Sequence, residues 1–287
     1  MVNKSNNPTK KVFVIGWPIE QSKSPIIHGH WLKLHGLEGS YEKIAVHPDD
    51  LASFISSLKN QGFVGGNVTI PHKQAVLAHV DVIHPTAERL GAANTLWFEE
   101  GQLHADNTDG YGFLANLDQQ APGWDQLDRG KALILGAGGA TRPIINGLFE
   151  RGFDKLVITN RTMARAQELA SLFANLGFGS RVSVLDWDNR SAELEDIDLV
   201  VNCSSLGMIG QPPLEMSLEG LQSSALVTDI VYNPLETGIL RQARKAGNRV
   251  VDGLGMLLHQ AVPGFEHWFG VRPTVTDQLR EQVLETK

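Results

Sequence analysis

Residues 131–141 run Lys131-Ala-Leu-Ile-Leu-Gly136-Ala-Gly138-Gly139-Ala140-Thr141. The apolar run predicts a buried strand, the glycines predict a tight turn, and the residues that follow predict a helix. Gly136 permits the turn and Gly138 lets the backbone approach a pyrophosphate, which the free N–H groups of the helix terminus would bind. Thr141 stands where a third Gly or Ala is usual, so a glycine turn without a ligand is the alternative. In this strand–turn–helix setting we predict a dinucleotide site.

The next strand indicates which dinucleotide is bound. It ends Leu156-Val-Ile-Thr-Asn160-Arg161-Thr162, and Arg165 follows. A site for NAD places an acid here, whereas guanidinium groups form bidentate bonds to phosphate. Arginine is also disfavoured at the positive end of a helix dipole unless an anion is bound. We therefore predict NADP(H) rather than NAD, with two solvated arginines at a helix start as the alternative.

The surrounding pattern alternates strands and helices. Strands are expected at 132–135, 156–159, 182–185, 199–202, 226–231 and 249–251, with helices at 163–176 and 237–246. This alternation predicts a doubly wound parallel sheet. The earlier region predicts mixed β/α structure, with strands at 11–16, 41–46, 64–70, 94–98 and 103–107 and helices at 24–35, at 49–59 and from Pro71. After residue 252 the pattern is helical, at 254–269 and 274–285.

Composition excludes several classes of protein. Lys and Arg total 25 against 32 Asp and Glu, giving a net charge of −7 without a basic run, so neither nucleic acid nor an anionic membrane is expected as a partner. No stretch of apolar residues is long enough to cross a bilayer, and residues 1–11 do not resemble a signal sequence. The lone Cys203 excludes a disulfide framework and fits the cytoplasm. His28 and His30 diverge on a helix, and we expect no metal.

A second polar segment, Asn67-Val-Thr69-Ile-Pro71-His72-Lys73, ends a predicted strand. Asn67 and Thr69 alternate with apolar residues and so share one face of that strand. Lys73 is expected in the first turn of the helix that begins at Pro71. Positive potential there favours loss of a proton from the amine, which suits proton transfer. A solvated surface lysine is the alternative.

Two further polar segments flank the predicted hairpin, and a third precedes the first helix. Residues 91–95 and 106–110 carry Asn94 and Asp109, and the carboxylate of Asp109 could face Lys73 across a cleft. Turn chemistry alone is the alternative explanation for both segments. Ser22 and Ser24 precede the first helix, where Ser24 could cap it or both hydroxyls could bind a carboxylate.

Taken together, these segments resemble the shikimate dehydrogenase family along the whole chain. The matching segments are 16–25, 67–73, 91–95, 107–110, 136–140, 160–162, 202–208, 229–234 and 253–260. The resemblance implies an α/β protein, with a mixed β/α substrate-binding domain, a Rossmann-like doubly wound NADP-binding domain and a cleft between them. It implies that residues 1–112, completed by 254–287, form the first domain and 113–253 the second.

The resemblance also implies an activity and its residues. The expected reaction is the reversible, NADP-dependent reduction of 3-dehydroshikimate to shikimate in aromatic amino acid biosynthesis. Lys73 and Asp109 are the implied catalytic pair. The implied substrate-binding residues are Ser22, Ser24, Asn67, Thr69, Asn94, Asp109, Tyr232 and Gln260. The implied cofactor-binding residues are Gly136, Ala137, Gly138, Gly139, Ala140, Asn160, Arg161, Thr162, Arg165, Gly253 and Met256.

Some positions depart from the family pattern. Gln21 stands where the family commonly has His, and Cys203 and Leu206 stand where small residues are usual. A shikimate/quinate dehydrogenase with relaxed substrate or NAD use is one alternative, and a non-catalytic NADP-binding sensor is another. Arg161 disfavours a methyltransferase, which would carry an acid there. We expect a cytoplasmic monomer or homodimer whose partner is a small-molecule substrate.

Overall fold

The computed structural model describes residues 9–126, 130–192 and 194–286. The segment 1–8, most of the stretch that we judged unlike a signal sequence, lies outside the described residues, as does the expected domain limit at 287. The chain divides into two compact units: unit 1 comprises Met1–Thr108 and Gln260–Lys287, and unit 2 comprises Asp109–His259. The junctions therefore fall at 108/109 and 259/260, where the sequence led us to expect 112/113 and 253/254.

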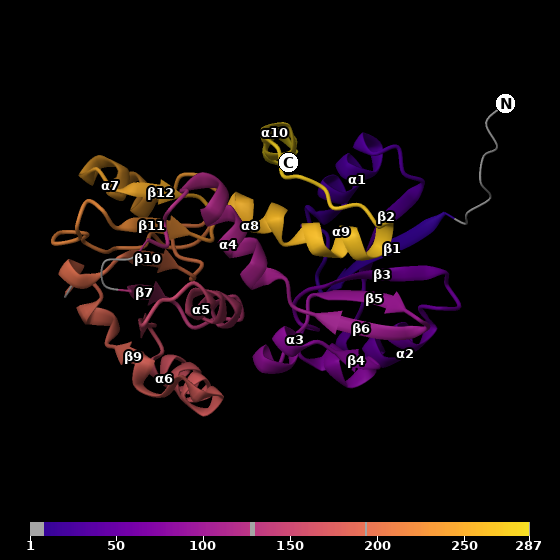
Figure 1. The fold of residues 1–287 in the computed structure, drawn as a ribbon, viewed down its shortest axis with the longest axis horizontal. Coiled ribbons are helices and arrows are strands. Elements are labelled where there is room, and N and C mark those ends of the chain that lie inside the picture. Colours follow the sequence, from indigo (N-terminus) through magenta and orange to yellow (C-terminus); the bar gives the residue numbers. More distant parts are fainter. Residues whose placement is uncertain (1–8, 127–129, 193, 287) are drawn as a thin grey trace. The chain divides into compact units, whose positions relative to one another are not determined.

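Unit 1 contains a six-stranded mixed sheet in the order β2-β1-β3-β5-β6-β4. Its strands are β1 (Lys10–Gly16), β2 (Gly39–Ala45), β3 (Phe63–Val68), β4 (Val82–Ile83), β5 (Thr95–Glu99) and β6 (Gln102–Asp106). Its α-helices are α1 (Ser24–Leu34), α2 (Leu51–Ser57), α3 (Pro85–Leu90), α9 (Ala261–Phe269) and α10 (Asp277–Glu285). β1 pairs in parallel with β2 and β3, whereas β3, β5 and β6 pair antiparallel. Figure 1 shows the yellow helix α9 beside the indigo strands that begin the chain, and α9 contacts β1, β3 and β5.

The centre of this sheet is apolar on both faces. Five consecutive residues of β1, from 12 to 16, are buried, as expected for a strand covered on both sides. The ring of Phe13 packs edge-on against Phe54 and Phe63, each with centroids 5.3 Å apart. A Cβ on Gly66 would lie 2.4 Å from the Phe13 ring, so the adjoining strand needs glycine there. The strand ends that carry the polar segments are thereby fixed to a rigid core.

The helix expected from Pro71 is absent. Residues 70–74 form a turn, which is followed by a 3₁₀ helix at Ala75–His79. The Lys73 carbonyl, which an α-helix would pair with residue 77, instead accepts a hydrogen bond from the N–H of Ala93 at 2.8 Å. Lys73 therefore lies in the turn that precedes this 3₁₀ helix, and the prediction that it occupies the first turn of an α-helix is wrong.

Unit 2 contains a six-stranded sheet in which every pairing is parallel, in the order β12-β11-β10-β7-β8-β9. Its strands are β7 (Lys131–Leu135), β8 (Lys155–Thr159), β9 (Val182–Leu185), β10 (Leu199–Asn202), β11 (Leu226–Asp229) and β12 (Arg249–Val251). Its α-helices are α4 (Asp109–Gln120), α5 (Thr141–Glu150), α6 (Met163–Phe173), α7 (Gly238–Ala246) and α8 (Leu254–His259). The strand order reverses between β7 and β10, which is where open α/β sheets bind ligands. The predicted α/β class, a mixed sheet and a doubly wound parallel sheet, is confirmed.

Two helices differ from expectation. Of the turn-forming segment 106–110, residues 109 and 110 begin α4, where the Asp109 carboxylate complements the helix N-terminus and apolar residues from 113 to 117 face the core. The single helix expected over 254–269 is two helices, α8 and α9. Pro263 explains the break, because its ring would clash with the carbonyl of His259, the last residue of α8.

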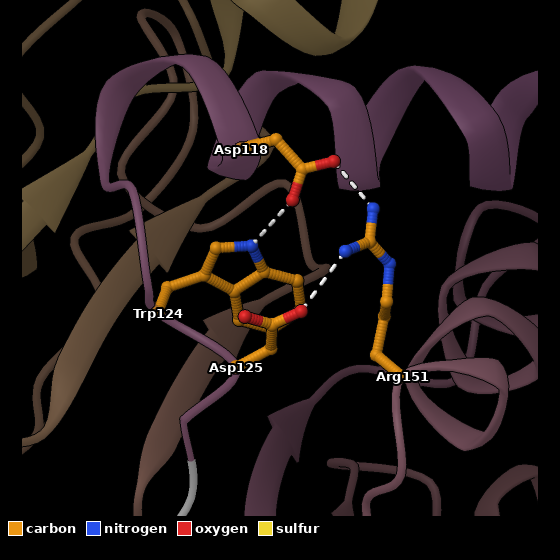
Figure 2. A network of polar contacts seen from close by, with 4 residues as sticks. All are labelled: Asp118, Trp124, Asp125 and Arg151. Atoms are coloured by element: carbon orange, nitrogen blue, oxygen red, sulfur yellow. Dashed lines mark hydrogen bonds and ion pairs between the residues drawn. The ribbon is translucent and has the colours of Figure 1, made fainter.

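A polar network links α4 to the end of α5 (Figure 2). The Arg151 guanidinium, directly after α5, forms ion pairs with Asp118 of α4 and, at 2.9 Å, with Asp125. The indole N–H of Trp124 donates to the other oxygen of Asp118 at 2.9 Å. Four side chains from three segments are therefore connected beside the parallel sheet, and none of them is a predicted site residue.

Candidate functional site

The centre of the polar cluster in unit 1 is the amide of Asn94. Its Oδ1 accepts hydrogen bonds from the Thr108 N–H and the Thr95 hydroxyl, both at 2.9 Å. Its Nδ2 donates to Gln260 Oε1 at 3.4 Å, and the Thr108 hydroxyl donates to the Gln260 carbonyl at 2.8 Å. The fold thus brings together Asn94 and Gln260, which are 166 residues apart in the chain. Thr95 and Thr108 join the cluster without having been assigned a role from the sequence.

Asn67, at the end of β3, extends this cluster toward β2. Its amide is buried, with 6% of the residue exposed, and Nδ2 donates to the Asn94 carbonyl at 3.0 Å and to the Thr95 hydroxyl at 3.3 Å. Its Oδ1 accepts from the hydroxyl of Tyr41 at 2.5 Å. Tyr41 was not predicted to belong to the site. The only signal for it in the sequence is that an aromatic residue stands within a predicted strand.

The loop that carries Lys73 is held by its neighbours on both sides. His72 is buried, and its Nε2 lies 2.8 Å from the Val46 carbonyl at the end of β2. The backbone bond between Lys73 and Ala93 joins the loop to the residue that precedes Asn94. The structure therefore places Lys73, which is partly buried, in a loop bonded to the segment that carries the predicted substrate-binding amide.

The two serines lie at the start of α1. Ser24 is the first residue of the helix, and the N-cap position belongs to Lys23, which makes no capping bond through its side chain. Ser24 is therefore not the helix cap, and Ser22 Oγ instead accepts from the Ser24 N–H at 3.4 Å. Thr69 follows β3, and its N–H donates to the carbonyl of Ile15 on β1 at 2.9 Å. The hydroxyls of Ser22, Ser24 and Thr69 therefore belong to segments that come directly after β1 and β3.

Two predicted substrate-binding residues belong to unit 2. Asp109 is buried as the first residue of α4, directly after Thr108. Tyr232 follows β11, and its partial burial raises the pKa of the phenol above its ordinary value. The pairing of Asp109 with Lys73, and the contribution of Tyr232 to a carboxylate site, stay predictions.

The glycine turn after β7 has the geometry of a dinucleotide cradle. Gly136 adopts φ +111°, and a Cβ there would lie 3.0 Å from the backbone of residues 203 and 204, which follow β10. A Cβ on Gly138 or Gly139 would meet nothing within 4 Å, so this side of the turn is open. The hydroxyl of Thr141 donates to the Gly136 carbonyl and accepts from the Gly138 N–H, each at 3.2 Å. The threonine that makes the fingerprint imperfect therefore closes the turn.

Asn160 joins this turn to the end of β8. Its Oδ1 accepts from the Ala137 N–H at 3.2 Å, and its Nδ2 donates to the Thr162 carbonyl at 2.8 Å. Arg161 and Arg165 are exposed on either side of the start of α6, and neither forms an ion pair with any residue that the structure describes. Two unneutralised guanidinium groups beside a glycine turn fit the additional phosphate of NADP.

The segment predicted to border the nicotinamide, which contains Gly253 and Met256, packs closely against neighbouring residues of unit 2. A Cβ on Gly253 would lie 2.4 Å from the carbonyl group of Ile230, which follows β11. A Cβ on Gly255 would lie 1.7 Å from Asn116 Oδ1 on α4, and Asn116 Nδ2 donates to the Asp252 carbonyl at 2.7 Å. Met256, which follows, packs partly buried against the core of unit 2. Only glycine fits at residues 253 and 255, so the position of Met256 is set by the backbone.

A buried carboxylate supports the same edge of the parallel sheet. Asp229 is 0% exposed and accepts from Asn202 Nδ2 at 3.0 Å, the Thr237 hydroxyl at 2.7 Å and the Val231 N–H at 2.9 Å. Burial raises the pKa of its carboxyl from 3.8 to about 6, against these hydrogen bonds. The sequence analysis assigned Asp229 no role, although adjacent strands that end in Asn and Asp could have indicated one.

Within residues 9–126, 130–192 and 194–286, no three His, Cys, Asp or Glu side chains gather as ligands for a metal ion. The helices of these same ranges are too short or too polar for any of them to cross a bilayer.

Comparison with known proteins identifies the family. Three family profiles match: the shikimate dehydrogenase substrate binding domain at residues 14–96, shikimate/quinate 5-dehydrogenase at 118–234, and the shikimate 5′-dehydrogenase C-terminal domain at 253–284. The NADP(+) shikimate dehydrogenase of Brucella abortus (strain S19) is 51% identical over 287 residues, covering 99% of this chain and 97% of the relative.

Solved structures agree with this match. The shikimate 5-dehydrogenase of Thermus thermophilus in complex with NADP(H) and shikimate superposes with a TM-score of 0.80 and 33% identity, covering 96% of this chain and 98% of the other. The quinate dehydrogenase of Corynebacterium glutamicum in complex with NAD superposes with a TM-score of 0.87 and 30% identity, covering 96% and 99%. With a hydroxyl-and-amide cluster in unit 1 and a dinucleotide turn in unit 2, the chain belongs to the shikimate dehydrogenase family.

Proposed function

We propose that this chain catalyses the reversible, NADP-dependent reduction of 3-dehydroshikimate to shikimate, a step of aromatic amino acid biosynthesis. The observation that carries the proposal is the cluster of Asn67, Asn94 and Gln260, which the fold assembles from three distant segments in the same unit as Lys73. Amides and hydroxyls suit a ligand that carries several hydroxyl groups, because they can both donate and accept hydrogen bonds.

Unit 2 supplies the residues that would hold the cofactor. The N–H groups of Gly136, Ala137 and Gly138 shape the turn through bonds within the fold, and the turn over residues 136–140 would hold the pyrophosphate. Arg161 with Arg165 would bind the phosphate that distinguishes NADP from NAD. Gly253 and Met256 would border the nicotinamide. When bound, NADP(H) donates or accepts the hydride at C4 of its nicotinamide ring.

Unit 1 supplies the residues that would hold and deprotonate the alcohol. Ser22 and Ser24, with Tyr232 of unit 2, bind the carboxylate, and the amide cluster with Thr69 binds the ring hydroxyls. In the oxidation direction the alcohol proton passes either to the amine of Lys73 or to Asp109 while the Lys73 ammonium stabilises the alkoxide. In the reduction direction the same group returns the proton to the new alkoxide.

One assay tests this proposal and separates it from its alternatives. Absorbance at 340 nm is followed with shikimate or quinate as substrate and with NADP+ or NAD+ as oxidant. We expect the highest kcat/KM with shikimate and NADP+. A higher kcat/KM with quinate or NAD+ would assign the chain to the relaxed shikimate/quinate group. Absence of turnover with all four combinations, together with NADP binding by calorimetry, would make it a sensor.

We also propose that the chain acts in the cytoplasm, as a monomer or a homodimer. Its one cysteine, Cys203, is a buried free thiol whose pKa burial raises above its ordinary value, so it is an unreactive group that fits a reducing compartment.

A further inference from the structure

Histidine 28 of α1 is buried in an unusual way. The residue is 0% exposed, and neither of its ring nitrogens forms a hydrogen bond of good geometry with a residue that the structure describes, although the Asn67 side chain lies close enough to act on its pKa. Its ring is stacked between those of Tyr41, with centroids 4.2 Å apart and planes at 11°, and Phe265, at 5.9 Å and 13°. A phenylalanine would fill this space without the cost of about 1–3 kcal/mol for an unpaired buried polar group. Packing alone therefore does not explain a histidine here.

The neighbour on which His28 stacks touches two predicted substrate-binding residues. The Tyr41 hydroxyl donates to Asn67 Oδ1 at 2.5 Å, and the Ser24 side chain lies close enough to the same hydroxyl to lower its pKa against the effect of burial. Burial raises the pKa of Tyr41 above its ordinary value, so the phenol keeps its proton as a donor at neutral pH. One hydroxyl thus connects the residue assigned to the substrate carboxylate with a residue assigned to the ring hydroxyls.

The hydrogen bonds of Asn67 determine what it can offer to a ligand. Reversing its amide would set Oδ1 against the Asn94 carbonyl, which lies 3.0 Å from Nδ2 and can only accept. The Tyr41 donor on the other side favours the same orientation. Both hydrogens of Nδ2 are directed to Asn94 and Thr95, so the remaining capacity is a lone pair on Oδ1. Held in this way, Asn67 accepts a hydrogen bond from a ligand hydroxyl.

His28 can support this arrangement without introducing a charge. Burial lowers the pKa of its imidazole to about 3, and the Asn67 side chain opposes that shift only in part. The ring is therefore neutral at physiological pH. It lies flat on the phenol of Tyr41 and adjoins Asn67, with Trp31 and Trp268 against its edges.

We propose that Tyr41 and His28 are positioning residues that hold the Asn67 carboxamide oxygen and the Ser24 hydroxyl in the orientation that a hydroxylated carboxylic acid requires. The proposal rests on the function proposed above. Neither residue need touch the substrate, because each acts through Asn67 or Ser24. The pair contributes to selectivity for a ligand that donates an O–H at the Asn67 position.

The first test replaces Tyr41 by phenylalanine, which keeps the ring and removes the donor. We expect Tyr41→Phe to raise the KM for shikimate about tenfold, equivalent to about 1.4 kcal/mol, with kcat and the KM for NADP+ changed less than about threefold. Ser40→Ala, which removes the neighbouring hydroxyl of the same strand, is the matched control and should leave the shikimate KM unchanged. A shikimate KM for Tyr41→Phe equal to that of the control would overturn the role of Tyr41.

The second test replaces His28 by phenylalanine and compares stability with affinity. Because Phe removes two unpaired nitrogens, we expect the Tm of His28→Phe to equal or exceed that of the parent, while the shikimate KM rises about threefold or more. His35→Asn, at the exposed end of the same helix, is the control. A purely structural histidine would give an unchanged KM, and that result would overturn its positioning role.

The parent enzyme separates this inference from the proposed function. Absence of shikimate oxidation by the parent chain refutes the proposed function itself. Normal oxidation by the parent, with parental KM values in Tyr41→Phe and His28→Phe, refutes only the positioning pair.

Discussion

The two units present their polar groups in different ways. Unit 1 gathers buried amide and hydroxyl side chains at the strand ends of a mixed sheet, and these side chains bond to one another before any ligand is considered. Unit 2 presents an open glycine turn at the reversal point of a parallel sheet, bordered by exposed arginines. The first site consists of side chains that the fold has ordered, and the second consists mostly of backbone.

This difference predicts how substitutions act. In unit 1, the Asn67 carboxamide bonds within the fold and is also the group proposed to bind the substrate, so its loss should affect both stability and affinity. In unit 2, the side chains of Arg161 and Arg165 form no ion pair with the residues described, so their truncation should affect ligand binding alone. Lys73 and Asp229 depart from this pattern, one in each unit. Lys73 of unit 1 is proposed to act in the reaction, and Asp229 of unit 2 is a buried side chain that supports the fold, so variants of both test the distinction.

Lys73→Ala should have the largest effect. General acid–base groups contribute about 10²- to 10⁴-fold, so we expect kcat to fall by that factor while the shikimate KM changes little. The bond of this residue to Ala93 uses the backbone carbonyl, which alanine retains, so any change in Tm reports the loss of the side chain alone. Initial rates at 340 nm and thermal unfolding measure both quantities, with the exposed Lys33→Ala as control. Turnover within threefold of the parent would remove Lys73 from the chemistry.

Asp229→Ala should give the largest loss of stability in unit 2. Three buried donors, from Asn202, Val231 and Thr237, would lose their acceptor, at a cost of about 3 kcal/mol or more. Chemical denaturation monitors this loss, and Asp229→Asn, which keeps one carbonyl oxygen, should lose less. Equal stability of the alanine variant and the parent would show that unit 2 has no buried polar support of the kind found in unit 1.

The same carboxylate predicts a dependence of stability on pH. Its pKa rises from 3.8 to about 6 on folding, so the folded chain binds this proton more tightly than the unfolded chain. The free energy of unfolding should therefore fall as pH rises from about 4 to about 6, by about 2–3 kcal/mol from this group, and this contribution should be constant above that range. Asp229→Asn should remove that slope. Parallel pH profiles of the two proteins would contradict the assignment to Asp229.

Most strands could be predicted from the sequence because their apolar runs are local. The failures have non-local causes. Where a helix was expected from Pro71, the Lys73 carbonyl bonds to Ala93, twenty residues later, a contact that no periodicity indicates. The turn-forming residues before Gly110 obscured α4, whose stability comes from apolar residues that face the core further along the helix.

The candidate site shows the same division. The glycine turn and Arg161 could be predicted from a continuous segment, since strand, turn and helix follow one another. Gln260 came only from the family resemblance, because its contact with Asn94 joins segments that are distant in the chain. Tyr41 and Thr108 were missed, since a strand tyrosine and a turn threonine have ordinary structural explanations until their partners are known.

Arg161→Ala tests the separation of ligand binding from stability in unit 2. Loss of charge-assisted bonds to a phosphate should raise the KM for NADP+ about ten- to a hundredfold and that for NAD+ less than about threefold. The side chain is exposed and forms no ion pair with the residues described, so the Tm should not change. Lys245→Ala, another exposed cation of unit 2, is the control. Equal losses for both cofactors would mean that Arg161 does not recognise the additional phosphate.

Arg151→Ala should have the smallest effect of these substitutions. In contrast to Arg161→Ala, it should lower stability and leave ligand binding unchanged, because it removes contacts within the fold of unit 2 (Figure 2). The guanidinium is 32% exposed and its partners Asp118 and Asp125 are 41% and 30% exposed, so solvent screens both ion pairs. Exposed pairs contribute about 0.2–1 kcal/mol each, and we expect a total loss near 1 kcal/mol, or about 2–4 °C in Tm.

Arg151→Lys keeps the charge but cannot contact both carboxylates through a planar fork, so an intermediate Tm is expected. High salt should reduce the difference between Arg151→Ala and the parent, because the pairs are accessible to counterions. The KM values for shikimate and NADP+ should remain at their parental values in both variants. A change in either KM would show that the scaffold of unit 2 and its ligand site are coupled, contrary to the separation that the exposed arginines indicate.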